Sequence, residues 1–374
     1  MKLTIPKNNL SSALQLAARA AATRSTLPVL ANILLTAQNG YLRLSATDLE
    51  LGITSQTLAH VQESGATTIP ARTFADLVKT LPEGEVSLTL KPATETLHIR
   101  CGATKADLKG IPAKDFPPVE MQDTGKGLKV EIPTLKEMIQ QVVFAASRDE
   151  ARPVLNGVLL KAKGNRLTLA AADGFRLAVA EMSLAQEAVE DGFQVVVPAR
   201  ALVELARALP TAGEVHLAPL SGKIIFQTEN LQVVSQLIDA NFPEYEAVIP
   251  RTYETRAVLT KAAFLNACSQ AAIFATHENN VTRLDFTPSN GVPGQVLVAA
   301  QAAETGEQQS ELPGSVEGKP LTIAFNVRYL QDALKVIDVP EIALEMTAPN
   351  CPGLLRPVGQ EGFLHVLMPM HLYN

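Results

Sequence analysis

Apolar residues indicate helices in three pairs of segments along the chain, with mixed spacing in the first helix of each pair and amphipathic spacing in the second. Each pair consists of a first helix and a second helix that follows after a stretch with a different pattern. The first helices are predicted at about residues 7–21, 134–146 and 261–274, and the second helices begin at Arg72, Arg200 and Arg328.

Short runs between the helices have the apolar concentration or alternation of strands. Examples are residues 33–35, 41–45 and 166–170, and Asn39-Gly40 has the composition of a tight hairpin turn. Each unit of the chain is therefore predicted to be α+β, with two helices and antiparallel hairpins.

The same short sequences return after 125 to 128 residues, which indicates an internal repeat. Pro70-Ala71-Arg72 returns as Pro198-Ala199-Arg200, Pro28-Val29-Leu30 as Pro153-Val154-Leu155, and Phe116-Pro117 as Phe242-Pro243. A more diverged third copy contains Asn326-Val327-Arg328. Loop-like sequences at 123–127 and near 250–252 separate the copies. We therefore predict three repeated domains, at residues 1–124, 125–251 and 252–374.

The second helices share one order of charges on the side opposite their apolar stripe: cation, acid, cation. The three sets are Arg72, Asp76 and Lys79; Arg200, Glu204 and Arg207; and Arg328, Asp332 and Lys335. One interpretation is an ordinary solvated face with ion pairs one turn apart. The other is a set of helices that present cations to one polyanion, weakly enough to let it slide.

Composition restricts any contact with nucleic acid to part of the surface. The 374 residues carry a net charge of −6, which excludes a basic coat over the whole chain. Aromatic residues make up 5% of the chain and Trp is absent, which argues against the aromatic stacking platforms that bind single-stranded bases. Three scattered cysteines and the absence of a secretory or membrane-spanning stretch favour the cytoplasm.

Motifs for catalysis and for cofactor or metal binding are missing from the sequence. The six histidines show no zinc-ligand spacing, and neither a complete phosphate-binding loop nor a nucleophile elbow occurs. We predict a non-catalytic protein without a cofactor. An enzyme whose site is assembled from scattered residues stays an alternative, as does a repeat-built interaction scaffold that does not act on DNA.

Several segments together resemble the family of bacterial sliding clamps, the beta subunit of DNA polymerase III, over essentially the whole chain. They are Leu27-Pro28-Val29-Leu30, 66–72, Leu155-Asn156-Gly157, 173–178, 241–245, 325–329 and 366–370. Three positions depart from the family pattern: Val154 replaces a frequent aromatic, Ala106 replaces a bulky apolar residue, and Tyr373-Asn374 extends the usual end.

The resemblance implies a three-domain protomer that joins a second copy head to tail as a ring around duplex DNA. Such a homodimer binds DNA without sequence specificity and gives processivity to the DNA polymerase III catalytic subunit. It also implies a clamp-loader ATPase and other proteins with clamp-binding motifs as partners.

The resemblance further implies a pocket for short apolar, Gln-containing peptide motifs. Its residues would be Leu155, Ala172, Gly174, Phe175, Arg176, Leu177, Pro243, Val248, Asn326, Tyr329, Val366, Met368, Pro369, Met370, His371 and Leu372. The apolar tail, with adaptable Met368 and Met370, fits this role. The alternatives are a last strand for the tail, a turn for Gly174 and the core for Phe175.

The two remaining site predictions concern DNA and the dimer. The candidate cations facing the hole of the ring are Arg24, Arg72, Lys79, Arg148, Arg152, Arg200, Arg207, Arg328 and Lys335, each of which could also be a simple surface charge. The resemblance places the dimer interface at Ala106, Leu108, Ile273 and Phe274. Ordinary core packing is the alternative for Ile273 and Phe274.

Overall fold

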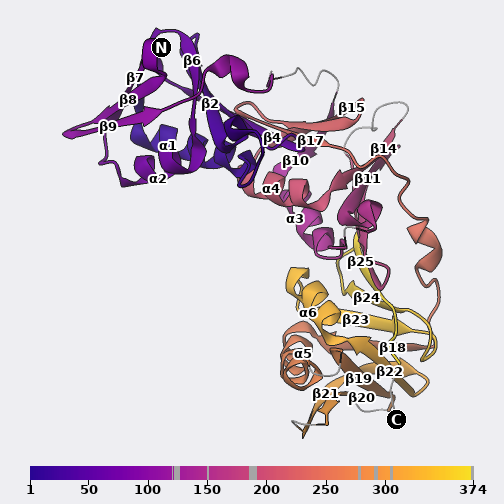
Figure 1. Cartoon of the computed structure of the whole chain (residues 1–374). Coiled ribbons are helices and arrows are strands. Elements are labelled where there is room, and N and C mark those ends of the chain that lie inside the picture. Colours follow the sequence, from indigo (N-terminus) through magenta and orange to yellow (C-terminus); the bar gives the residue numbers. More distant parts are fainter. Residues whose placement is uncertain are drawn as a thin grey trace. The chain divides into compact units, whose positions relative to one another are not determined.

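The computed structural model forms two compact units, each with its own sheets (Figure 1). The first unit comprises residues 1–134 and 200–237, and the second comprises 135–199 and 238–374. Within them the structure describes residues 1–119, 121, 127–149, 151–184, 192–276, 279–289, 294–303 and 306–371.

Six α-helices lie in the described residues, at the predicted places. They are α1 (Lys7–Ala17), α2 (Ala71–Thr80), α3 (Ile132–Val143), α4 (Ala199–Ala208), α5 (Lys261–Ala275) and α6 (Val327–Val336). Short 3₁₀ turns are η1 (Ala18–Ala20), η2 (Pro28–Ala31), η3 (Pro92–Thr94), η4 (Ala113–Asp115), η5 (Pro153–Asn156) and η6 (Tyr245–Val248).

The second helices bury the predicted apolar stripe. Phe74 on α2, Leu205 on α4 and Leu330 on α6 have no exposed surface. Burying a side chain of this size stabilises a fold by about 1.5 to 3 kcal/mol. The helix faces that carry Arg72, Arg200 and Arg328 are exposed. The amphipathic pattern therefore fixes which side of each helix is available for binding.

The first unit contains two antiparallel sheets. A five-stranded sheet has the order β5-β1-β7-β8-β9, and an eight-stranded sheet has the order β10-β15-β16-β17-β4-β3-β2-β6. Their strands are β1 (Lys2–Pro6), β2 (Asn32–Gln38), β3 (Tyr41–Thr47), β4 (Leu51–Leu58), β5 (His60–Glu63), β6 (Gly65–Pro70), β7 (Glu85–Lys91), β8 (Thr96–Cys101), β9 (Thr104–Lys109), β10 (Leu128–Glu131), β15 (Glu214–Leu220), β16 (Lys223–Gln227) and β17 (Leu231–Gln236).

The predicted hairpin turn joins β2 to β3. Asn39 has φ 52° and Gly40 has φ 81°, the left-handed pair that two-residue hairpins require. The eight-stranded sheet then continues from β4 into β17, with Gly52 opposite Val234. Strands of neighbouring repeats thus form one sheet. The division at residues 124 and 251 stays a prediction, because compactness alone divides the chain differently.

The second unit contains one antiparallel sheet of twelve strands, in the order β14-β11-β12-β13-β25-β24-β23-β18-β21-β20-β19-β22. They are β11 (Gly157–Lys163), β12 (Arg166–Ala172), β13 (Arg176–Ser183), β14 (Phe193–Pro198), β18 (Thr255–Thr260), β19 (Val281–Thr287), β20 (Gly294–Ala302), β21 (Gly306–Gly318), β22 (Leu321–Asn326), β23 (Glu341–Met346), β24 (Gly353–Pro357) and β25 (Phe363–Leu367).

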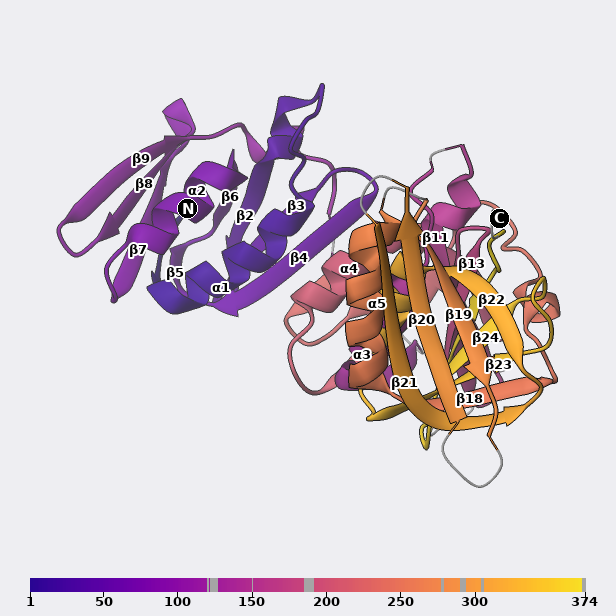
Figure 2. The same cartoon turned by 90° about the horizontal axis from the view of Figure 1, so that it is seen from below.

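The long strand β21 changes partners along its length. Its residues 306–314 pair with β20, and residues 315–318 pair with β18. Helix α5 packs against α6 and lies across β20 and β21 (Figure 2). None of the helices in the described part of the chain is long and apolar enough to cross a bilayer.

Candidate functional site

The apolar C-terminal run contributes an internal strand of the second unit. Strand β25 lies between β13 and β24, with Leu177 opposite Val366 and Arg176 opposite Leu367. Val366 and Leu367 are 2% and 0% exposed. The alternative of a last strand is therefore correct for these two residues, and it places Val366 beneath the surface of the predicted pocket.

The tail leaves the sheet after Leu367 and runs between two other segments. The Met368 N–H donates to the Phe175 carbonyl at 2.9 Å, and the Met370 N–H donates to the Ala324 carbonyl at 2.8 Å. Met368 is 41% exposed. Pro369 and Met370 are half-buried and His371 is exposed, while Leu372 lies outside the described residues. The tail thus presents Met368 at the surface beside Phe175.

The turn before β13 has the geometry that its sequence demands. The Asp173 Oδ1 accepts hydrogen bonds from the backbone N–H groups of Phe175 at 2.9 Å and Arg176 at 3.0 Å. Gly174 has φ +94°, a conformation that favours glycine. The turn therefore accounts for Gly174. Phe175 is 62% exposed, so the alternative of a core aromatic is wrong.

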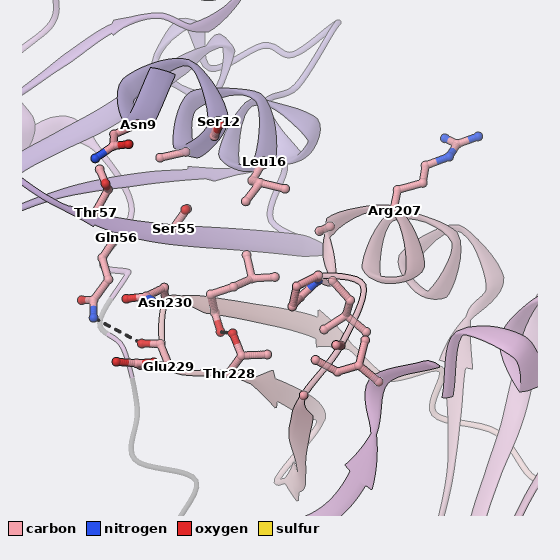
Figure 3. Close-up of a pocket in the computed structure, with 18 of the residues that line it drawn as sticks. Asn9, Ser12, Leu16, Ser55, Gln56, Thr57, Arg207, Thr228, Glu229 and Asn230 are labelled. Atoms are coloured by element: carbon pink, nitrogen blue, oxygen red, sulfur yellow. Dashed lines mark hydrogen bonds between the residues drawn. The ribbon is translucent and has the colours of Figure 1, made fainter. Parts of the chain in front are cut away.

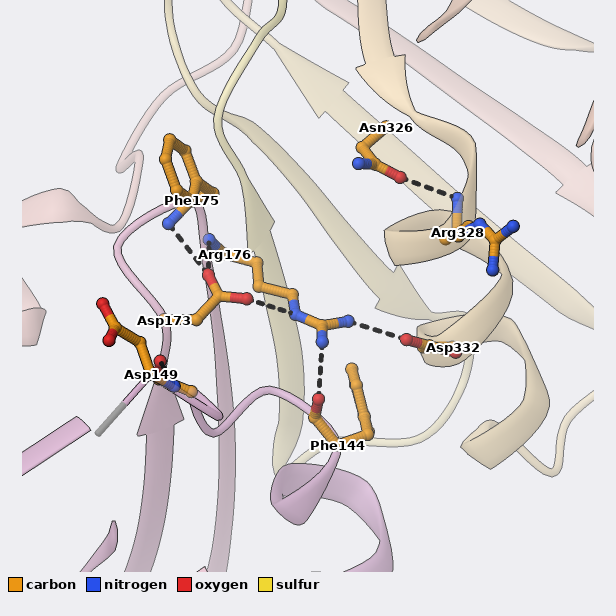
Figure 4. Close-up of polar contacts among 9 residues, drawn as sticks. Phe144, Asp149, Asp173, Phe175, Arg176, Asn326, Arg328 and Asp332 are labelled. Carbon is orange, nitrogen blue, oxygen red and sulfur yellow. Dashed lines mark hydrogen bonds and ion pairs between the residues drawn. The ribbon is translucent and has the colours of Figure 1, made fainter. Parts of the chain in front are cut away.

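Arg176 connects three segments behind this turn (Figure 4). Its Nε is 2.9 Å from the Asp173 Oδ2, its Nη1 is 2.8 Å from the Asp332 Oδ2, and its Nη2 donates to the Phe144 carbonyl at 2.6 Å. The guanidinium lies 4.3 Å from the centroid of the Tyr329 ring. With its side chain 10% exposed, Arg176 positions the site and offers little surface for binding.

The other predicted pocket residues divide into buried and exposed ones. Leu177 and Val366 belong to a buried cluster with Phe242 and Tyr245, against which Ala172 packs. Leu155 is buried too. Pro243 and Val248 are exposed, Tyr329 is half-buried, and half-buried Asn326 accepts from the Arg328 N–H at the start of α6. The exposed side chains of Phe175, Val248 and Met368 are apolar and can contact apolar groups of an extended chain.

The roles of three residues of this region were not predicted from the sequence. Phe144 and Asp332 hold Arg176 from distant positions, and no local pattern indicates that pairing. His365 is fully buried, with its ring 5.4 Å from that of Phe144. Burial, together with the nearby Arg176 guanidinium, lowers the pKa of His365 to about 3. His365 is therefore neutral at pH 7.

The second helices expose all six of their predicted cations, with different degrees of compensation. Arg200 is 2.8 Å from the Asp48 carboxylate, Arg207 is 2.8 Å from Glu204, and Arg72 is only 3.9 Å from Asp76. Among the described residues, no ion-pair partner lies within 4 Å of the exposed cations Arg24, Lys79, Arg148, Arg152, Arg328 and Lys335.

Ion pairing within the helix therefore explains only part of the repeated charge order. In α6 the intervening Asp332 binds Arg176 instead of the flanking cations. Arg328 Nε instead donates to the Asn280 side chain at 2.7 Å. The charged faces of α2 and α4 keep an internal pair each, and the face of α6 keeps two cations without one.

The predicted interface residues differ in their exposure, and only Ile273 among them is largely exposed. Ala106 and Leu108 are half-buried on β9, the outer strand of the five-stranded sheet. Ile273 on α5 is 70% exposed, so core packing does not explain it, whereas Phe274 is half-buried. Residues 306–314 of β21 pair on one side only among the described strands.

A cavity that the sequence did not indicate lies in the first unit (Figure 3). It has a volume of about 780 Å³ between α1, β4, the end of α4 and the turn after β16, and its lining includes Ser12, Gln56, Arg207, Thr228 and Asn230. Nowhere in the described residues do three His, Cys, Asp or Glu side chains gather as metal ligands would.

Known proteins match the chain from end to end. Models of the N-terminal, central and C-terminal domains of the DNA polymerase III beta subunit match residues 1–120, 129–244 and 246–371. A beta sliding clamp of Synechococcus elongatus is 35% identical over 378 residues, covering 100% of both chains.

Solved structures agree with this match. The DNA polymerase sliding clamp from Bacillus subtilis has a TM-score of 0.93 at 28% identity. The DNA polymerase III subunit beta from Pseudomonas aeruginosa, bound to griselimycin, has a TM-score of 0.91 at 33% identity. Both comparisons cover 100% of both chains.

Proposed function

The chain belongs to the DNA polymerase III beta subunit family, and on this basis we propose how it works as a sliding clamp. The protein is a non-catalytic processivity factor that tethers a polymerase to DNA. The observation that carries this function is the match of three consecutive family domains over residues 1–120, 129–244 and 246–371. A scaffold unconnected with DNA has no comparable support.

The working form is a ring of two chains joined head to tail. Closed assembly covers sheet edges that would otherwise template aggregation. Two edges are suited to meet: β9 with exposed Lys105 and Lys109, and residues 306–314 of β21 with exposed Glu307 and Glu311. The opposite charges along the two edges favour this pairing. The apolar Leu108 and Ile273 then lie at the contact, which gives Ile273 the cover it lacks in one chain.

Duplex DNA passes through the ring and contacts the cations on the second helices. Arg72, Lys79, Arg328 and Lys335 are exposed and weakly compensated, while Arg200 and Arg207 already have acidic partners. Phosphate contacts of this kind carry no base information, so binding is independent of sequence. Retention then rests on the closed ring, with the cations keeping the duplex centred.

The surface over β13 and β25 binds short motifs of the polymerase and of other clamp-binding proteins. Its floor is Leu177 and Val366, and its exposed apolar rim includes Phe175, Val248 and Met368. An extended peptide can place apolar side chains on this floor. Methionine at the rim adapts to different partners.

Loading a closed ring requires an opener, because duplex DNA without nearby ends cannot enter otherwise. We assign this role to a clamp-loader ATPase, which acts in the cytoplasm where the DNA lies. The test uses nicked circular DNA, a bacterial clamp loader and ATP, followed by gel filtration. The protein should stay with the circle and leave after the DNA is cut to a linear form. Equal retention on linear DNA with free ends contradicts encirclement.

A further inference from the structure

The turn after β3 in the first unit repeats the aspartate-centred hydrogen bonds of the turn in the peptide-binding surface. The Asp48 Oδ1 accepts from the N–H groups of Glu50 at 3.1 Å and Leu51 at 2.8 Å. Asp173 makes the same two bonds to Phe175 and Arg176. The other carboxylate oxygen of Asp48 pairs with Arg200. The two turns are therefore copies of one structure in successive repeats.

The neighbouring strands repeat as well. The Gln236 N–H donates to the Glu50 carbonyl at 2.8 Å, as the Met368 N–H donates to the Phe175 carbonyl at 2.9 Å. Gly52 opposite Val234 repeats Leu177 opposite Val366. Buried Phe116, followed by Pro117, takes the place of Phe242 and Pro243. The first unit thus repeats the turn, the strand pairing and the Phe-Pro pair of the peptide-binding surface.

A cavity of about 230 Å³ lies at this place in the first unit. Its lining includes Leu49, Glu50, Gly52, Pro117, Val119 and Val234. Glycine at position 52 leaves open the space that Leu177 fills in the second unit. A side-chain carbon added at Gly52 would come no closer than 3.8 Å to any neighbour, so packing does not require glycine there.

Leu49 is the feature that points to a ligand. Its φ of +80° is one that a leucine rarely adopts, and the matching position in the second unit is Gly174 with φ +94°. The side chain is 52% exposed. The first unit thus keeps a strained apolar side chain at the cavity mouth although glycine would serve the turn. Backbone strain of this kind is commonly retained at binding sites.

The charges around the cavity describe its ligand. Gln236, the last residue of β17, has a charged residue on each side. Exposed Glu50 lies next to it on the side of β4, and Lys223 lies opposite it on β16. Neither Glu50 nor Lys223 has an ion-pair partner among the described residues. An extended segment with an aliphatic residue between a basic and an acidic one would satisfy both charges.

We propose that this cavity is a second peptide-docking site of the clamp, for extended segments with one aliphatic side chain between opposite charges. The inference rests on the proposed peptide-binding function of the second unit, because the cavity is identified as a site by its likeness to that surface. The exposed Leu49 side chain covers the apolar residue of the peptide, which enters above Gly52. The site is more polar than the one in the second unit, so it selects different segments.

The test measures fluorescence anisotropy of two labelled heptapeptides, Gly-Ser-Lys-Leu-Asp-Ser-Gly and Gly-Ser-Asp-Leu-Lys-Ser-Gly, on the full-length protein. One order should bind, and Leu49→Gly and Glu50→Lys should each weaken it at least tenfold. Gly52→Leu, which fills the cavity, should do the same. The melting temperature of Leu49→Gly should stay within about 4 °C of wild type, since relief of backbone strain offsets the removal of apolar packing.

A polymerase-derived peptide separates this site from the one in the second unit. Deleting Met370 to Asn374 should remove binding of the polymerase peptide and leave the heptapeptide unaffected, and Leu49→Gly should do the reverse. Heptapeptide binding that is lost with the tail and kept in Leu49→Gly overturns the second site alone. Absence of binding by both heptapeptides at millimolar concentration overturns it too. Unchanged polymerase-peptide binding after the deletion contradicts the proposed function of the tail instead.

Discussion

Arg176 and Asp332 stand 156 residues apart in the chain and meet through an Nη1–Oδ2 contact of 2.8 Å. Because Arg176 also holds Asp173, its loss leaves two carboxylates without their cation. We expect Arg176→Ala to lower the free energy of unfolding by about 2 to 4 kcal/mol in urea denaturation. The matched control is Arg166→Ala, whose ion pair with Glu181 is exposed and should contribute less than about 1 kcal/mol. Equal effects of the two variants would show that the Arg176 contacts are not stabilising.

The exposed aromatic ring of Phe175 and the tail should both be needed for peptide binding. Phe175→Ala should weaken a polymerase-derived peptide at least tenfold, and deletion of Met370 to Asn374 should abolish binding while the dimer persists. The first effect follows from loss of an exposed apolar ring. The second follows because the deletion removes the hydrogen bond from the Met370 N–H to the Ala324 carbonyl, which holds the tail in place. Tyr253→Ala, a change at a 47% exposed aromatic residue outside this surface, is the control in fluorescence anisotropy. Unchanged affinity of the deletion variant would remove the tail from the site.

Ile273 should be required for the dimer. An aspartate in place of this 70% exposed residue would be buried without a partner in the ring, and we expect monomers by light scattering at micromolar concentration. Phe274→Asp should add to the effect, although Phe274 is half-buried and its replacement also disturbs α5. Leu220→Asp, at a 43% exposed position on β15, should stay dimeric. A dimeric Ile273→Asp protein would place the interface elsewhere.

The cations without acidic partners should determine the salt dependence of DNA binding. Replacing Lys79 and Lys335 by Gln removes two positive charges per chain that would neutralise phosphates. The plot of log K against log salt should then become shallower by about 0.9 for each phosphate that is no longer neutralised. Lys161→Gln is the control, because Lys161 lies on β11 and pairs with Glu246. An unchanged slope in the double variant would exclude both lysines from the DNA path.

His365 should make the second unit sensitive to acid. Its pKa is lowered to about 3 in the folded protein, while the unfolded chain takes up a proton near pH 6.5. The contribution of neutral His365 to the free energy of unfolding is therefore fully present above pH 6.5. It falls by up to about 1.4 kcal/mol per pH unit as the pH drops toward 3. His365→Phe should flatten this part of the stability curve in urea denaturation.

Local sequence predicted the parts of the fold that depend on neighbouring residues. The second helices begin one residue before the repeated arginines, and Asn39-Gly40 forms its turn. The first helix ends at Ala17, where a 3₁₀ turn follows, and the spacing of apolar residues alone does not mark that change. Repetition made the helices predictable, because each pattern appears three times.

Pairings between distant residues were beyond such reasoning. The contact of Arg176 with Asp332 depends on how β13 packs against α6, and no sequence pattern joins the two. The turns at Asp48 and Asp173 correspond in the structure, but the strain at Leu49 became visible only through its backbone angle. Resemblance supplied the residues of the predicted pocket, and the structure separated buried residues such as Val366 from exposed residues such as Phe175.

The pairing of β4 with β17 has a consequence for the synthesis of the chain on the ribosome. Strand β4 ends at Leu58, and the strand that covers its edge is complete only at Gln236. While the ribosome is still making the middle of the chain, the first repeat therefore carries an open edge able to pair with other nascent chains. Newly made clamp should be most in need of chaperones during that interval, before its own later sequence closes the sheet.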